Sequence, residues 1–281
     1  MKTGINQWCF PNTYTVRQSV AAAAAAGFDG IELNVVDEFV AQAEPGDIAA
    51  ITLETTADEL EQIKGWAGEY GVELPSVSTG LHWKYSLTSN DPELREKGKG
   101  VAVKMLEVAK GLGADTILVV PGVVTSDVSY KTAYDRALGA FRELAAEAEK
   151  YQVSIGVENV WNKFLLSPLE MRRFIDEVGS DWVGAYFDAG NVLAFGFAHH
   201  WVEALGDKIC KVHVKDFRTE VGNIRGFTSL FEGDMDWVAL VESLKSVGYD
   251  SYLTAELSPY RYQPEMLVTD TAEKLRRVVS L

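Results

Sequence analysis

Four ionisable side chains follow one another along the second half of the chain, and each stands at the end of a short apolar run. They are Glu158, Asp188, His213 and Glu256. Three carboxylates that meet at one point repel each other, so they need a cation. One imidazole and three carboxylates without a thiolate suit Mn²⁺, Mg²⁺, Co²⁺ or Fe²⁺ better than structural zinc. The set predicts a site for one divalent metal ion.

Such a centre permits proton transfer next to a carbonyl group. A divalent ion that chelates adjacent oxygens of a hydroxy-ketone stabilises the enediolate that forms when a C–H proton leaves. Glu158 and Glu256 could then face opposite sides of one carbon, one removing the proton and the other returning it. Return to the opposite face gives an epimerase, whereas return to the neighbouring carbon gives an aldose–ketose isomerase.

The elements that position these residues follow a repeated pattern. A helical run ends in glycine, the residue that stops helices in the left-handed conformation, and an apolar or β-branched run follows at once. The glycines are Gly27, Gly71, Gly113, Gly179, Gly206 and Gly248. A seventh unit, around residues 150–159, lacks the glycine, and an opening strand over 4–10 has no helix before it. The clearest helices are predicted over 16–26, 94–112, 134–150 and 237–247.

Eight strands that alternate with helices imply parallel strands joined by right-handed crossovers. The run 116–120 is continuously apolar, as is typical of a strand buried on both faces. Eight βα units in about 250 residues is the size of a (β/α)8 TIM barrel, in which functional residues stand at the carboxyl ends of the strands. A doubly wound sheet would carry a glycine-rich phosphate motif after its first strand, and residues 6–10 offer none. We therefore expect a single domain over 1–281.

Composition limits the partners. The chain has 26 Lys and Arg against 41 Asp and Glu, a formal charge of −15, and 47% hydrophobic residues. This balance repels phosphate backbones and anionic lipid, so neither nucleic acid nor a membrane is an expected partner. No leader pattern or run of about 20 apolar residues is present, which favours a cytoplasmic protein. Cys9 and Cys210 are interpreted as buried apolar residues, and a homo-oligomer stays open.

Several segments together resemble a known family. The stretches 155–159, 187–191, 212–216, 233–237 and 255–257 are similar to the sugar phosphate isomerase/epimerase superfamily, whose xylose-isomerase-like TIM barrels include ketose 3-epimerases of the D-tagatose 3-epimerase type. Gly30-Ile31-Glu32 and residues 112–115 also match in place. The resemblance implies that Glu158, Asp188, His213 and Glu256 are metal ligands, and that Glu158 and Glu256 are the acid/base pair. It also implies that Arg218 contacts substrate hydroxyls and that Lys215-Asp216 gives structural support.

The chain departs from the ketose 3-epimerases at two places. Residues 161–165 stand where those enzymes have a substrate-binding glutamate, and Asn191 stands where they have a histidine. Lys163 and Arg218 could instead meet a phosphate or carboxylate on the sugar. Further candidates for substrate contact are Glu32, His82, Trp8 and Asn191. Thr219 and Glu220 begin a segment that runs through Gly222 and Gly226, and these glycines predict a mobile lid.

Four functions stay open at this point. The leading hypothesis is a metal-dependent epimerase or isomerase of a small ketose or ketose phosphate. The first rival is a dehydratase of a keto-polyol, of the inosose or dehydroshikimate type, on the same barrel. An endonuclease of this fold needs three metals and more histidines than the four present. A sugar-binding protein without activity is the last alternative.

Overall fold

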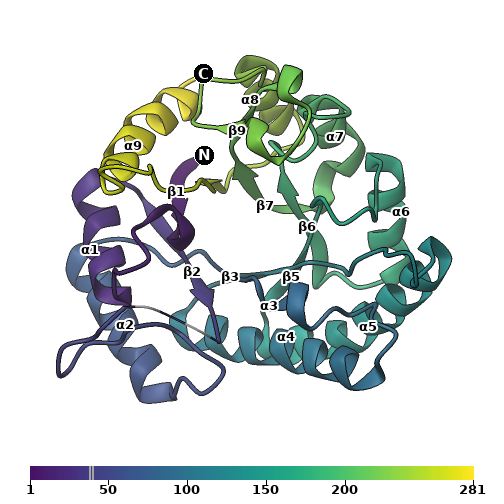
Figure 1. Ribbon diagram of the computed structural model, residues 1–281, viewed down its shortest axis with the longest axis horizontal. Helices are drawn as coiled ribbons and strands as arrows, with labels where there is room; N and C mark the ends of the chain where they lie inside the picture. The colour runs from purple at the N-terminus through teal and green to yellow at the C-terminus, as the bar shows by residue number, and fades with distance from the viewer. Residues whose placement is uncertain (38, 40) are drawn as a thin grey trace.

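The computed structural model describes every residue except 38 and 40, and its main strands close into one parallel barrel (Figure 1). Around the barrel the strand order is β1-β10-β7-β6-β5-β4-β3-β2, and β1 pairs with β2 to close it. This confirms the predicted TIM barrel and excludes the open sheet. The barrel strands are β1 (Lys2–Asn6), β2 (Gly30–Val35), β3 (Ser76–Thr79), β4 (Thr116–Val119), β5 (Ser154–Glu158), β6 (Val183–Asp188), β7 (Ile209–Val214) and β10 (Tyr252–Ala255).

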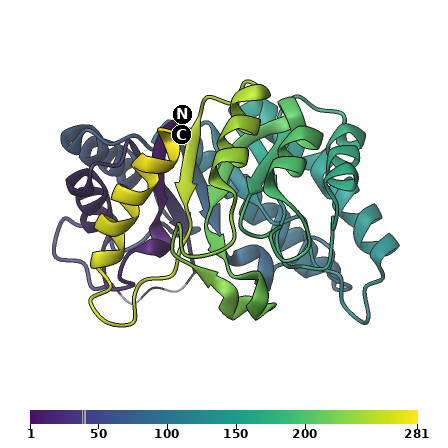
Figure 2. The same cartoon turned by 90° about the horizontal axis from the view of Figure 1, so that it is seen from above.

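Helices surround the barrel, and a small hairpin of β8 (Asp216–Phe217) and β9 (Phe227–Thr228) follows β7. The side view places both termini at one end of the barrel and this green hairpin at the other (Figure 2). The helices are α1 (Val16–Ala26), α2 (Ala57–Tyr70), α3 (Leu81–Lys84), α4 (Pro92–Leu112), α5 (Tyr130–Tyr151), α6 (Pro168–Val178), α7 (Ala198–Leu205), α8 (Trp237–Ser246) and α9 (Met266–Val279). None of those described has the length and apolar character of a membrane span.

The helix ends show how the repeated sequence pattern stops each helix before the next strand. Glycines in the left-handed conformation end α1, α2, α4 and α6, as predicted. For Gly206 the prediction is wrong, because it ends α7 with φ of 55° and ψ of −126°. In α5, where the sequence offers no glycine, Gln152 takes the same conformation with φ of 55°. Two helices begin earlier than expected, because Asp91 caps α4 ahead of Pro92 and Ser129 caps α5. Capping side chains satisfy amide groups that the first helical turn leaves free.

The first strand is shorter than predicted. It ends at Asn6, whose side chain accepts a hydrogen bond from the Trp8 amide and turns the chain into a 3-10 helix over Gln7–Cys9. The prediction of a strand to residue 10 is therefore wrong. The turn leaves Trp8 37% exposed at the barrel mouth, whereas Cys9 is fully buried.

Strand β4 shows how the barrel divides its apolar residues. Ile117 and Val119 belong to the main core, while Leu118 and Val120 form a separate cluster with Tyr186. Successive side chains of a strand point to opposite faces, so the second pair points into the barrel. Leu118 and Val120 also line the cavity at the mouth. Apolar side chains thus form part of the floor beneath the candidate site.

Candidate metal centre and active site

Four side chains converge at the carboxyl end of the barrel. Glu158 and Asp188 are the last residues of β5 and β6, His213 lies in β7, and Glu256 directly follows β10. One ligand atom from each lies within 4.8 Å of the corresponding atoms of the other three. We call these four residues the cage. The fold therefore brings together the set that the sequence singled out, with three members buried and Glu256 partly exposed.

The atoms of the cage fit a divalent cation. His213 Nδ1 is buried and has no hydrogen-bond partner among the described residues, and it lies 3.9 Å from Glu256 Oε2. Asp188 Oδ2 is also buried, and the Lys215 ammonium lies 2.7 Å from it. Buried polar atoms are rarely left without a partner. An imidazole nitrogen and carboxylate oxygens that face one point make the donor set of a hard or borderline metal ion.

A network beneath the cage fixes the orientation of His213. Its Nε2 lies 2.6 Å from Glu32 Oε1, which also accepts a hydrogen bond of 2.5 Å from Asn6 Nδ2. The other oxygen of Glu32 accepts hydrogen bonds from Ser76 Oγ at 2.6 Å and from the Tyr186 hydroxyl. Glu32 is fully buried. Such an outer carboxylate holds a ligating histidine with its second nitrogen directed at the metal.

Charge around His213 shifts the pKa values of this pair. Burial lowers the pKa of His213, but Glu32 and Glu256 outweigh it and raise that pKa to about 9. Burial raises the pKa of Glu32, yet His213 and the hydrogen bonds to Glu32 bring it below its ordinary value. Occupation of Nδ1 by a metal must therefore release a proton, which makes metal affinity depend on pH.

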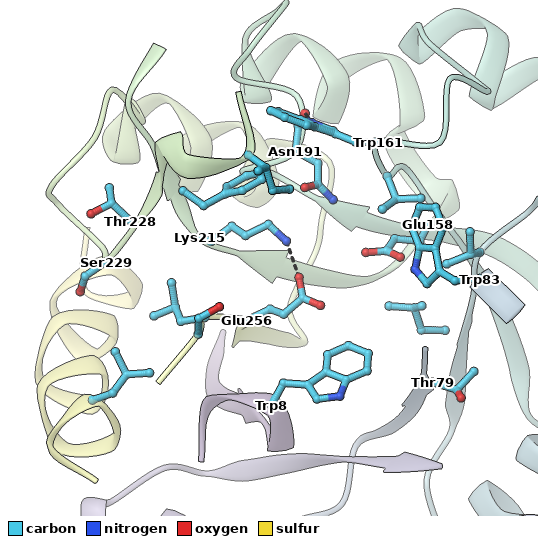
Figure 3. A pocket seen from close by; sticks show the side chains of 18 of the residues that line it. Trp8, Thr79, Trp83, Glu158, Trp161, Asn191, Lys215, Thr228, Ser229 and Glu256 are labelled. Carbon is cyan, nitrogen blue, oxygen red and sulfur yellow. Dashed lines mark hydrogen bonds and ion pairs between the residues drawn. The ribbon is translucent and has the colours of Figure 1, made fainter. Parts of the chain in front are cut away.

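Lys215 places a positive charge against the cage. Its Nζ lies 2.7 Å from Asp188 Oδ2 and contacts Glu256 Oε2, as the dashed line in Figure 3 shows. Burial raises the pKa of Glu158 well above its ordinary value, and Glu256 and Asp188 add to that rise. Burial also acts on Glu256, but Lys215 and His213 outweigh it and lower the pKa of Glu256 to about 2. The two glutamates thus differ strongly in proton affinity.

A cavity of about 700 Å³ opens above the cage, within the range of small-molecule sites. Glu158 and Glu256 reach it from different sides, and Trp8, Trp83 and Asn191 form part of its wall (Figure 3). The other lining residues are Thr79, Leu118, Val120, Val160, Trp161, Lys215, Ile224, Phe227, Thr228, Ser229, Glu232, Leu257, Ser258, Tyr260 and Leu267. A polar centre under an aromatic and aliphatic wall suits a small polyol.

Other predicted substrate contacts lie outside this lining. Lys163 is exposed in the loop after β5. Arg218 donates a hydrogen bond of 2.9 Å to the Glu232 carbonyl. His82 is fully buried in α3, and its Nε2 lies 3.2 Å from the Gly98 carbonyl oxygen. Glu32 lies beneath the cage. Of the predicted substrate contacts, the cavity wall includes Trp8 and Asn191.

Sequence reasoning missed several residues of the cavity, among them Trp83 and Lys215. Trp83 lies in α3, a short helix that the sequence pattern did not predict. Lys215 was interpreted as structural support, yet it stands two residues after His213. Alternate residues of an extended chain share a face, so this spacing is the signal that places its side chain beside the cage.

Comparison with known sequences gives relatives of low identity over most of the chain. The Haemophilus influenzae protein named "Putative L-ribulose-5-phosphate 3-epimerase SgbU" is 25% identical over 285 residues, which cover 97% of this chain and 94% of that protein. L-Ribulose-5-phosphate 3-epimerase UlaE from Salmonella typhimurium is 26% identical over 251 residues, with 88% and 83% covered. These alignments cover most of each chain.

Solved structures share the same fold. D-Psicose 3-epimerase from Clostridium cellulolyticum H10 superposes with a TM-score of 0.80 at 17% identity, and 99% of each chain is covered. A structure of L-ribulose 3-epimerase gives a TM-score of 0.76 at 16% identity, with 99% of this chain and 94% of that one covered. The family model described as "Xylose isomerase-like TIM barrel" matches residues 20–278. The chain therefore belongs to the xylose isomerase-like TIM barrel family.

Proposed function

We propose that this protein is a divalent-metal-dependent epimerase that inverts C3 of a small ketose or ketose phosphate. The observation that carries the proposal is the placement of Glu158 and Glu256. They enter one cavity from β5 and β10, which β6 and β7 separate in the barrel. Inversion at carbon requires two proton-transfer groups on different sides of that carbon. The names of the relatives, ribulose-phosphate 3-epimerases, support the same reaction.

Glu158, Asp188, His213 and Glu256 would hold the ion, and Mn²⁺, Mg²⁺ or Co²⁺ suit this donor set. When bound, a divalent ion polarises the carbonyl and a neighbouring hydroxyl of the substrate. His213 Nδ1, which no described residue hydrogen-bonds, supports this assignment, because the hydrogen bond between Nε2 and Glu32 already directs Nδ1 at the cage.

The glutamates carry the proton steps. One takes the proton from C3 and leaves an enediolate, and the other returns a proton to the opposite face. In the reverse direction the two roles exchange, as microscopic reversibility demands. Asn191 and Trp8, which line the cavity, hold the sugar chain while the proton moves.

The candidate substrates are free ketoses and ketose 5-phosphates. Lys163 and Arg218, which the sequence offered as phosphate contacts, do not line the cavity. The relatives nevertheless carry the name of a phosphorylated pentulose. Both free ketoses and ketose 5-phosphates therefore belong in the substrate panel, with L-ribulose 5-phosphate first.

The test is incubation in D₂O. Protein stripped with EDTA and reloaded with Mn²⁺ is incubated with L-ribulose 5-phosphate, L-ribulose, D-tagatose and D-fructose, and the products are read by NMR. We expect one ketose to give its C3 epimer with deuterium at C3, and no exchange before metal is restored. Deuterium at C1 or C2 would indicate aldose–ketose isomerisation, and loss of water would indicate the dehydratase. Absence of exchange in every ketose would refute the proposal.

A further inference from the structure

Lys215 is the cationic side chain that lines the cavity beside the cage. Its side chain is 12% exposed, and its Nζ is shared between Asp188 and Glu256. In Figure 3 its ammonium points at Glu256 from the side opposite Glu158. A lysine tied only to surface carboxylates would point away from the cavity, whereas this one points into it.

The surrounding chain is shaped to admit this lysine. A Cβ placed on Gly190 would lie 2.4 Å from Lys215 Cγ and 2.6 Å from its carbonyl oxygen, so the turn after β6 leaves room that any larger residue would fill. On its other side the Lys215 ammonium lies 5.1 Å from the centre of the Phe227 ring. These contacts confine the stem and direct the ammonium toward the cage.

The charge of the cage indicates a role for Lys215, because a divalent ion alone does not neutralise the cage. The cage carries three carboxylates, so a divalent ion leaves it with one excess negative charge. The ammonium of Lys215 balances that charge. Without it, the substrate would gain negative charge on an oxygen next to a site that is already net negative, which raises the energy of the enediolate.

We propose that Lys215 is a catalytic residue: its ammonium stays among the cage carboxylates beside the divalent ion and donates a hydrogen bond to the substrate oxygen that gains negative charge. This inference rests on the function proposed above. The step balances without further reactants. The C3 proton passes to a glutamate, the C–H electron pair enters the enediolate, and Lys215 keeps its protons throughout.

The first test needs no substrate. Two cations in one cage repel each other, so Lys215→Met should tighten Mn²⁺ binding by at least about tenfold, whereas Lys215→Arg should bind Mn²⁺ nearly as the wild type does. Lys211→Met is the matched control: this lysine lies on β7, the strand that ends just before Lys215, and its side chain is 4% exposed. Its ammonium lies 2.6 Å from Asp115 and not in the cage. Mn²⁺ dissociation constants are read by titration calorimetry, and circular dichroism verifies folding. If Lys215→Met does not fold, Lys215→Gln carries the same expectation.

The second test uses Mn²⁺-saturated protein and measures deuterium exchange into L-ribulose 5-phosphate and D-tagatose. Exchange should fall at least about a hundredfold in Lys215→Met and recover in part in Lys215→Arg. Unchanged or weaker Mn²⁺ binding by Lys215→Met overturns the inference and leaves the epimerase proposal intact. Tighter binding with undiminished exchange removes the catalytic role. A wild-type protein that binds no Mn²⁺ overturns both proposals.

Discussion

The two halves of the barrel mouth differ in kind. Strands β5, β6, β7 and β10 end in the charged cage and Lys215, while the half formed by β1 to β4 presents neutral side chains to the cavity, among them Trp8, Trp83 and Leu118. The first half can hold a cation and move protons, whereas the second half offers shape and apolar surface. We infer that chemistry and substrate fit are assigned to separate sides of one cavity.

Hydrogen bonds to Glu32 link the two halves beneath the cavity. Glu32 belongs to β2, on the neutral side, but its carboxylate is directed down into the barrel and binds His213 Nε2. The neutral side thus contributes a charge only where that charge supports a ligand of the cage. Substitutions in the charged half should change turnover and metal binding, and substitutions in the neutral wall should change the Michaelis constant.

The largest effect is expected from the two glutamates. Glu158→Gln and Glu256→Gln keep the shape of the side chain but remove its ability to take a proton, so turnover should fall about 10²–10⁴-fold in each. Metal content must be measured in every variant, because both residues also belong to the cage. Glu232→Gln is the control, since this glutamate lines the same cavity but binds Lys274 instead. Full turnover in a metal-loaded Glu158→Gln protein would contradict the assignment.

The sequence predicted the charged half far better than the neutral one. Glu158, Asp188, His213 and Glu256 end apolar runs, and strand ends of a barrel meet at one face, so periodicity alone brings them together. The neutral wall depends on local turns. Trp83 lies in the short helix α3, and Trp8 projects because the side chain of Asn6 bends the chain after β1.

Burial was the other property that the sequence did not reveal. The sequence placed Glu32 and His82 near strand ends, but Glu32 stands in the middle of β2 and His82 lies in α3 after β3. Both are fully buried away from the cavity. A position near the carboxyl end of a strand predicts at which end of the barrel a residue lies, but it does not predict where the side chain points. That direction depends on partners distant in sequence, such as Tyr186 for Glu32.

His82 tests whether the neutral half excludes charge. Burial lowers the pKa of this histidine from 6.5 to about 4. As the pH falls below 6.5 the unfolded chain takes up a proton that the folded chain refuses, so His82 should cost up to roughly 3 kcal/mol of folding free energy by about pH 4. Urea unfolding of wild type and His82→Gln between about pH 7.5 and 4 measures the difference. If the unfolding free energy depends on pH equally in the two proteins, His82 titrates as an exposed residue. Substrate contact at the barrel mouth would require such exposure.

Glu32 tests the link between the halves. Glu32→Leu removes the carboxylate that orients His213, and Mn²⁺ affinity should weaken about 10–100-fold. Ser76→Ala removes one hydrogen bond to Glu32 and leaves the contact with His213, so its effect on Mn²⁺ affinity should be smaller. The order of the two dissociation constants is the measurement. Wild-type affinity in Glu32→Leu would show that His213 is held without it.

The smallest effect is expected in the aromatic wall. Trp8 and Trp83 are 37% and 49% exposed and line the cavity, so a bound sugar can cover part of each ring. Covering about 40 Å² of apolar surface contributes roughly 1 kcal/mol, so Trp8→Leu or Trp83→Leu should raise the Michaelis constant about fivefold. Turnover should change little, because an indole ring cannot take the proton from carbon. Phe195→Leu is the control, since Phe195 is 58% exposed outside this cavity. A loss of turnover without a change in the Michaelis constant would show that these rings act in the reaction and not in substrate binding. The two halves of the barrel mouth would then not have separate roles.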